Sequence, residues 1–275
     1  MTFHEFAASH GLVLRGLEMG KIIRCSTTDN TKSKNGAYLF EGDWGFVQNW
    51  GLHESPIIWQ DKGVEDTPKF REKVKNSQIK HSKERALNAA RAAEKAVEML
   101  ANCSLEISTY MAKKGFADTC FNMLERDNDY PLLVIPMRKD GRIVGCQTID
   151  HEGGKKFLFG MVTKGASFTI GSGSVTLLVE GYASALSLQL ALSKIGIKYK
   201  ILICFSAGNV AHIAKSNPNA IIICDHDKSL VSQTMATKSG LRYWVPPDIG
   251  SDVNDTHMSL GLFKLSQMLK KEFIL

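Results

Sequence analysis

The stretches VTLLVE (residues 175–180) and AIIICDHD (residues 220–227) decide the fold of this chain. Each is a short apolar run rich in β-branched residues, as in a strand that is buried on both faces, and a helical pattern follows each run. Open α/β sheets bind ligands beyond the carboxyl ends of their strands, so Glu180, Asp225 and Asp227 are expected to meet there. Three converging carboxylates predict a site for Mg²⁺ or Mn²⁺, because hard cations prefer oxygen ligands.

Strands and helices alternate throughout residues 171–275. Further strands are predicted at 200–205 and 241–245, and helices at 183–195, after Gly208, near 229–239 and at about 253–271. Short connections between alternating strands and helices predict right-handed crossovers and a mostly parallel sheet. We therefore expect an α/β protein whose catalytic domain is Rossmann-like. Asn209 follows Gly208 at a helix start, where backbone N–H groups meet phosphates.

The preceding segment, residues 103–170, predicts a β-rich basic subdomain. Strands at 132–136 and 142–149 flank Asp140-Gly141, a hairpin turn signal, and residues 105–114 have the pattern of a helix. The basic residues expected beside the acidic strand ends are Arg138, Arg142, Lys155, Lys156 and Lys164.

Two further segments complete the chain. Residues 63–102 are rich in Lys, Glu and Ala, which predicts a charged connector of one or two exposed helices. Residues 1–62 predict a small β-rich module with strands at 21–25, 37–40 and 45–50. Aromatic and basic side chains alternate in that module, as in proteins that bind single-stranded nucleic acid, although the rings alone would also suit the core of a small sheet. The residues concerned are Lys21, Arg24, Lys32, Lys34, Tyr38, Trp44 and Trp50.

Composition and cysteine content limit which cellular compartments and which cofactors are expected. The 275 residues carry a net charge of +6, which suits a polyanionic partner, and contain neither a membrane-spanning run nor a secretory signal. Six scattered cysteines are typical of a cytoplasmic protein. The N-terminal module has only Cys25 where zinc needs two Cys/His pairs, so no zinc is expected. The chain has no phosphate-binding loop of the helicase type.

Several motifs resemble known proteins. Glu180-Gly181-Tyr182-Ala183, Asp225-x-Asp227 and the strand order resemble the TOPRIM domain of topoisomerases, bacterial-type primases and some nucleases. The upstream motifs resemble phage and plasmid TOPRIM primases and follow the same order: Gly36-Ala37-Tyr38, GFVQNW (residues 45–50), YMAKKG (residues 110–115), Pro136-Met137-Arg138 and Lys155-Lys156-Phe157.

The resemblance implies roles for particular residues. Glu180 would be the acidic residue of the first TOPRIM motif, and Asp225 and Asp227 the metal ligands. Asp252 or Asp255 would supply the downstream acidic segment. The residues expected to contact template or nucleotide are Arg138, Arg142, Lys155, Lys156, Lys164, Asn209 and Lys228. Residues 1–62 would correspond to a zinc ribbon that has lost its ligands, and Leu230 stands where many relatives have glycine.

The function that the resemblance implies is that of a DNA primase. It would join ribonucleoside triphosphates on single-stranded DNA, in the host cytoplasm if phage-encoded, with a separate replicative helicase and no membrane partner. Two alternatives stay open: a TOPRIM-type metal-dependent nuclease, and a non-catalytic nucleic-acid-binding accessory protein of replication. A topoisomerase is disfavoured because the chain has no room for a large tyrosine-bearing cleavage domain. Acidic residues at strand-to-helix junctions also serve as plain helix caps.

Overall fold

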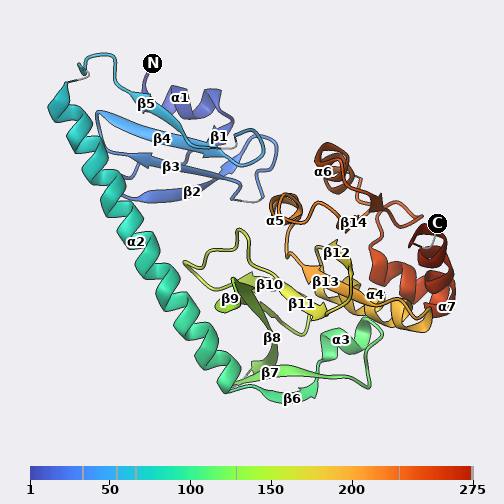
Figure 1. Ribbon diagram of the computed structural model, residues 1–275. Helices are drawn as coiled ribbons and strands as arrows, with labels where there is room; N and C mark the ends of the chain where they lie inside the picture. Colours follow the sequence, from blue (N-terminus) through green and yellow to red (C-terminus); the bar gives the residue numbers. More distant parts are fainter. Residues whose placement is uncertain (33, 54, 66, 128, 229, 274–275) are drawn as a thin grey trace. The chain divides into compact units, whose positions relative to one another are not determined.

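The computed structural model describes residues 1–32, 34–53, 55–65, 67–127, 129–228 and 230–273. It divides into two compact units, Met1–Lys83 and Glu84–Leu275. The described residues form a mixed α/β structure with three five-stranded sheets (Figure 1). The division between the units falls inside α2 (Pro68–Ala101), a single helix in the segment where the sequence predicts a helical connector. No described helix combines the length and apolar character that crossing a membrane requires.

The first unit consists of α1, an antiparallel sheet and the beginning of α2. Its elements are α1 (Phe3–Ser9), β1 (Leu12–Val13), β2 (Ile22–Thr27), β3 (Gly36–Phe40), β4 (Trp44–Asn49) and β5 (Ile57–Gln60), with the strands paired in chain order. Thr2 and Glu5 form a reciprocal capping box that begins α1. Phe3 then packs against Tyr38 and Trp59, with ring centroids 5.9 and 5.3 Å apart. The three predicted strands are present, whereas the sequence analysis missed α1, β1 and β5.

The second unit begins with another antiparallel sheet. Its strands are β6 (Ser104–Ile107), β7 (Cys120–Arg126), β8 (Asp129–Lys139), β9 (Arg142–Ile149) and β10 (Lys155–Phe157), in the order β10-β9-β8-β7-β6. The predicted Asp140-Gly141 turn is confirmed: Lys139 pairs with Arg142, and the turn residues have φ of 51° and 78°. The helix expected over 105–114 is wrong in its first half. Strand β6 ends at Ile107, and Ser108 caps the shorter α3 (Thr109–Lys113) through its side chain.

The C-terminal sheet contains the two stretches from which the fold was predicted. Its strands are β11 (Phe168–Gly171), β12 (Val175–Val179), β13 (Tyr199–Ile203), β14 (Ile221–Ile223) and β15 (Tyr243–Trp244), in the order β11-β13-β12-β14-β15. The pairs β12–β13, β12–β14 and β14–β15 are parallel. The sequence analysis missed β11, which runs antiparallel to β13, so the sheet is mixed.

Helices connect the strands of this sheet. They are α4 (Tyr182–Lys194), α5 (Ala207–Ala214), α6 (Val231–Ser239) and α7 (Val253–Phe273). All four are predicted from the sequence, although Ser229, at the expected start of α6, lies outside the described residues. Gly261, with φ of 78° and ψ of 159°, kinks α7 where a continuous helix was expected. Helices α4 and α7 pack against each other (Figure 1), and their apolar residues join those of both sheets of this unit in one core.

Candidate functional site

Two neighbouring parallel strands bring predicted carboxylates to one edge of the C-terminal sheet. Val179 at the end of β12 pairs with Ile223 at the end of β14. Glu180 follows Val179 directly, and Asp225 follows Ile223 by two residues. The side chains of Glu180 and Asp225 are half-buried, and Asp227 is exposed. The strand register therefore explains why separate runs of sequence deliver acidic groups to the same edge.

These carboxylates act on one another electrostatically. Burial, together with the charges of Glu180 and Asp252, raises the pKa of Asp225 to about 7. Burial is also the main cause of the raised pKa of Glu180, to which Asp227 contributes. Lys155 opposes both of these pKa shifts. The charged forms of the two carboxylates are thus disfavoured in the free protein, and an added cation would favour them.

One carboxylate oxygen in this group has no partner. Asp225 Oδ1 is buried and accepts no hydrogen bond. A buried polar atom without a partner is costly, so it marks a position that suits a proton or a cation. Mg²⁺ commonly binds through one or two carboxylates and completes its shell with water and phosphate oxygens, so the residues present fit this ion.

The acidic side chains do not form a closed cage. In the described ranges, no three His, Cys, Asp or Glu side chains are arranged so that they could hold a metal ion. The expected meeting of Glu180, Asp225 and Asp227 around one point is therefore absent from this structure. An ion at this edge would depend on few protein ligands and on oxygens that a substrate brings.

Asp252 and Asp255, the downstream acidic pair at the start of α7, differ in whether they act on Asp225. The N–H of Asp255 donates to Asp252 Oδ1 (2.8 Å), and the N–H of Asp252 donates to Asp255 Oδ2 (3.1 Å). This reciprocal arrangement begins α7 in the manner of a capping box. Asp255 Oδ1 also lies 3.4 Å from Lys114 Nζ. Asp252 is close enough to Asp225 to raise its pKa. Of the two residues predicted as metal ligands, Asp252 is therefore the one that belongs to the carboxylate group.

Strand β10 places one of its two lysines at the carboxylates. Lys155 lowers the pKa of both Glu180 and Asp225, whereas Lys156 has no such effect on either. Successive side chains of a strand point to opposite faces, which explains the difference. The ring of Phe157 meets that of Phe205 edge-on, with centroids 6.3 Å apart. The sequence analysis treated Lys155 and Lys156 alike, and the structure separates them.

Lys164 belongs to a different group of cations. Burial is the largest cause of the lowered pKa of His212, and the charges of Lys164, Lys139 and Lys215 lower it further. Lys139 Nζ lies 3.5 Å from the carbonyl oxygen of Lys164. Lys139, Lys164, Lys215 and His212, called here the lysine cluster, have no ion pair within the described residues. The sequence analysis identified only Lys164, because the four side chains come from three separate segments.

The remaining predicted cations of the second unit are exposed. Arg138 and Arg142 lie on the β8–β9 hairpin, where Arg138 Nη1 donates to the carbonyl oxygen of Gly141 (3.3 Å). Lys228 directly follows Asp227 in a turn and is also exposed. All three side chains are accessible to a nucleic acid. No described contact directs them toward the carboxylates.

Asn209 has a structural position. Its side-chain oxygen accepts from the N–H of Gly165 (2.7 Å), and its amide nitrogen donates to the carbonyl oxygens of Ala166 and Cys204 (both 2.8 Å). Its own N–H bonds to Ser206, the N-cap of α5. The groups of Asn209 that the sequence assigned to a phosphate are therefore already used inside the protein.

Replacing Asn209 by Ala should destabilise the fold by about 3 kcal/mol, because three buried backbone groups lose their partner. Urea denaturation measures this loss of free energy of unfolding. Asn217→Ala is the control, since Asn217 makes one such bond, to the carbonyl oxygen of Ile213 (2.9 Å), and should lose about 1 kcal/mol. Equal losses in both variants would show that the bridge made by Asn209 has no special weight.

Phe205 anchors the backbone beside the carboxylates, and sequence reasoning missed it. Its φ of 67° is left-handed, which is uncommon for an aromatic residue. Its N–H donates to the carbonyl oxygen of Glu180 (3.0 Å), next to the bond from Cys204 N–H to Val179 (2.8 Å). A backbone hydrogen bond from Ala207 also acts on the Glu180 side chain and lowers its pKa. The crossover from β13 to α5 thus fixes the position of Glu180.

In the first unit, the structure corrects part of the expected nucleic-acid contact. Tyr38 and Trp44 are only 2% and 1% exposed, so they belong to the core of the sheet and cannot stack on bases. Trp50 is 45% exposed, and the Arg24 guanidinium lies over its ring at 4.1 Å. Lys21 pairs with Glu18. The exposed groups Arg24, Trp50, Lys32 and Lys34 stay available.

Comparison with known proteins gives little. No protein-family model matches the chain, and no curated protein does. Among solved structures, the crystal structure of a DNA primase domain from Pseudomonas aeruginosa matches with 16% identity and a TM-score of 0.34. The match covers 50% of this chain and 49% of the primase-domain chain. This chain therefore spans about half the length of that structure. Similarity of this extent establishes neither a shared fold nor a shared function.

Proposed function

We propose that this chain is a DNA primase whose catalytic domain, residues 171–275, is of the TOPRIM type. The observation that carries the proposal is the position of Glu180 and Asp225 after paired ends of adjacent parallel strands, beside Lys155. Carboxylates and a cation at the carboxyl end of a parallel sheet suit nucleotidyl transfer, in which phosphate charge must be balanced while the reacting groups are held in line.

The carboxylates have the central part in this proposal. Glu180 and Asp225 would bind Mg²⁺ or Mn²⁺ together with oxygens of the substrate, and Asp227 and Asp252 would add negative charge nearby. When bound, such an ion neutralises phosphate charge and makes a nearby hydroxyl more acidic. Asp225 supplies an oxygen that has no other partner. Lys155 would pair with a phosphate of the incoming nucleotide, because it already lies near the two half-buried carboxylates.

In the proposed reaction, the 3′-hydroxyl of a ribonucleotide attacks the α-phosphorus of a ribonucleoside triphosphate on a single-stranded DNA template. A new P–O bond forms, pyrophosphate leaves with the electrons of the broken bond, and the hydroxyl proton passes to solvent. We assign Arg138, Arg142, Lys156, Lys228 and the lysine cluster to the backbone of the template and primer. Cations that lack acidic partners supply the charge that such a polyanion requires.

The setting of the reaction is also part of the proposal. All six cysteines are free thiols, which suits the cytoplasm. The proposal also includes a separate replicative helicase, which would open the template.

Incubation with labelled single-stranded DNA decides among the possible activities. The four reactions contain or lack ribonucleotides and contain or lack Mg²⁺, and a denaturing gel resolves their products. Short RNA that requires both additions is the result expected of a primase. Cleavage of the DNA with metal alone would instead identify a nuclease that uses the same carboxylates. Binding that ignores the metal and yields no product would identify a non-catalytic protein.

A further inference from the structure

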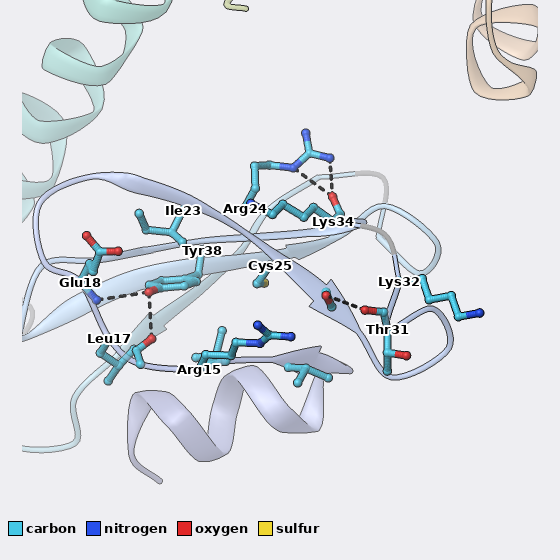
Figure 2. A pocket seen from close by; sticks show the side chains of 14 residues that line it. Arg15, Leu17, Glu18, Ile23, Arg24, Cys25, Thr31, Lys32, Lys34 and Tyr38 are labelled. Carbon is cyan, nitrogen blue, oxygen red and sulfur yellow. Dashed lines mark hydrogen bonds between the residues drawn. The ribbon is translucent and has the colours of Figure 1, made fainter. Parts of the chain in front are cut away.

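The first unit contains a cavity that the proposed catalysis does not use. Its volume is about 520 Å³, and it lies between the segment that follows β1 and the neighbouring strands β2 and β3 (Figure 2). The exposed side chains of Val13 and Leu17, with the half-buried Ile23, form the apolar part of its wall. The Tyr38 hydroxyl donates to the carbonyl oxygen of Gly16 (3.0 Å) and accepts from the N–H of Glu18 (3.2 Å), which holds the segment after β1 in place.

The lining of this cavity is strongly cationic. Four basic side chains contribute to it: Arg15, Arg24, Lys32 and Lys34. Figure 2 shows that they come from three segments: Arg15 from the stretch after β1, Arg24 from β2, and both lysines from the loop before β3. The acidic residue of the lining, Glu18, is paired with Lys21. Within the described residues, none of the four cations has an acidic partner.

Arg24 is held in one orientation. Its Nε donates to the carbonyl oxygen of Lys34 (3.1 Å), and its guanidinium also lies over the exposed ring of Trp50, 4.1 Å from the centroid. A guanidinium fixed in this way loses little side-chain freedom when it binds an anion, and its planar fork suits phosphate oxygens. Arg15 and the two lysines remain free to adjust to a ligand.

Size and chemistry together select a class of ligand. Cavities that bind small molecules occupy about 300–1,000 Å³, with mainly apolar walls and a few polar groups that fix the orientation. A purely electrostatic patch would need no apolar recess, and an apolar ligand would need no four cations. A nucleoside phosphate has a flat, weakly polar base for the wall and an anionic group for the arginines and lysines.

We propose that this cavity binds a nucleoside phosphate, either a free nucleotide or one residue of a single strand. The choice of a nucleotide over other organic phosphates rests on the proposed function. The residues of the cavity belong to Met1–Lys83 and those of the carboxylate site to Glu84–Leu275, so the two can be tested separately.

The test uses the full chain with Asp225→Asn and Asp227→Asn, in EDTA, so that the carboxylate site does not hold metal-bound nucleotide. Arg15→Gln and Lys34→Gln are combined, which removes two charges and keeps the backbone oxygen of Lys34 that Arg24 needs. Lys80→Gln combined with Lys83→Gln, at exposed positions of α2 outside the cavity, is the matched control, because it also removes two charges. Thermal melting shows that each variant is folded.

Two probes separate the two sources of the ligand. Fluorescence anisotropy follows a labelled oligothymidylate, and calorimetry follows ATP. The double variant should bind at least one probe about tenfold more weakly. For the oligonucleotide, the slope of log K against log salt concentration should become shallower by about 1.4, because each of the two lost phosphate contacts contributes about 0.7. If the double variant binds ATP more weakly, the ligand of the cavity is a free nucleotide. If only its binding of the oligonucleotide is weaker, the ligand is one residue of a single strand.

The inference is overturned if the double variant binds both probes as well as the Lys80→Gln, Lys83→Gln control does. It is also overturned if the chain that carries only Asp225→Asn and Asp227→Asn binds neither probe. Those results leave primer synthesis by the unmodified protein unaffected. Conversely, a chain that binds nucleotide in this cavity and synthesises no primer refutes the proposed function while the inference holds.

Discussion

Replacing Asp225 or Asp227 by Asn is expected to abolish primer synthesis, with a loss of about a thousandfold or more, while the chain stays folded. The substitution keeps the size of each side chain and removes the charge that a metal ion and its phosphates require. Metal ions contribute several kcal/mol to such a transition state, and each 1.36 kcal/mol is tenfold in rate. Extension products on a defined single-stranded template, separated on a gel, measure the loss.

Asp118→Asn provides the control for this experiment. Asp118 is exposed in the same unit and has no interaction in the described structure, so its replacement changes the net charge equally. Synthesis by this variant should equal that of the unmodified protein. Near-normal synthesis by Asp225→Asn and Asp227→Asn would refute the assignment of the carboxylate site. A loss of primer synthesis in all three variants would show that the change in overall charge, and not the carboxylate site, causes the effect.

The second large effect concerns stability without metal. Folding raises the pKa of Asp225 from 3.8 to about 7, so between these values the folded chain binds a proton that the unfolded chain has released. Stability contributed by this proton is therefore present at low pH and is lost as the pH rises toward and through 7. At pH 8 in EDTA, Asp225→Asn should exceed the unmodified protein in free energy of unfolding by about 2 kcal/mol, allowing for partial exposure. At pH 4 the difference should nearly vanish.

Urea denaturation across this pH range measures the difference, and Mg²⁺ should reverse it. A hundredfold excess of metal over its dissociation constant stabilises a protein by about 2.7 kcal/mol, provided that only the folded state binds it. This gain should appear in the unmodified protein and in Asp118→Asn but not in Asp225→Asn. Parallel pH profiles for all three chains would show that Asp225 carries an ordinary carboxylate.

The strand ends that define the site could be predicted because their signal is local. A β-branched apolar run followed by an acidic residue is visible in six to eight letters, and the carboxyl ends of parallel strands share one edge. The pairing of Val179 with Ile223, which brings Glu180 and Asp225 together, depends instead on the whole sheet. The reciprocal cap of Asp252 and Asp255 had a signal that was overlooked: two acceptors three residues apart at a helix start.

Other parts of the site had no local signal. The lysine cluster joins Lys139, Lys164, His212 and Lys215, and no spacing in the sequence relates residues so far apart. The burial of Tyr38 could not be read from alternation, because four of the five residues of β3 are buried on both of its faces. Trp44 likewise follows the packing of the first unit, where α1 supplies Phe3 to the core. Tertiary packing therefore decided which rings face solvent.

The left-handed backbone of Phe205 has a consequence for engineering this chain. A non-glycine residue in that conformation carries about 1–2 kcal/mol of steric strain, which the rest of the fold must outweigh. Glycine adopts such a φ freely, but it would delete the Phe205 ring, which is 7% exposed in the core of the second unit, and losing a buried aromatic ring costs about 3–5 kcal/mol. Glycine would also loosen the turn that pins Glu180 and remove the ring that faces Phe157. At this position a stable fold and a fixed Glu180 therefore call for the same residue, and the backbone strain is tolerated for both.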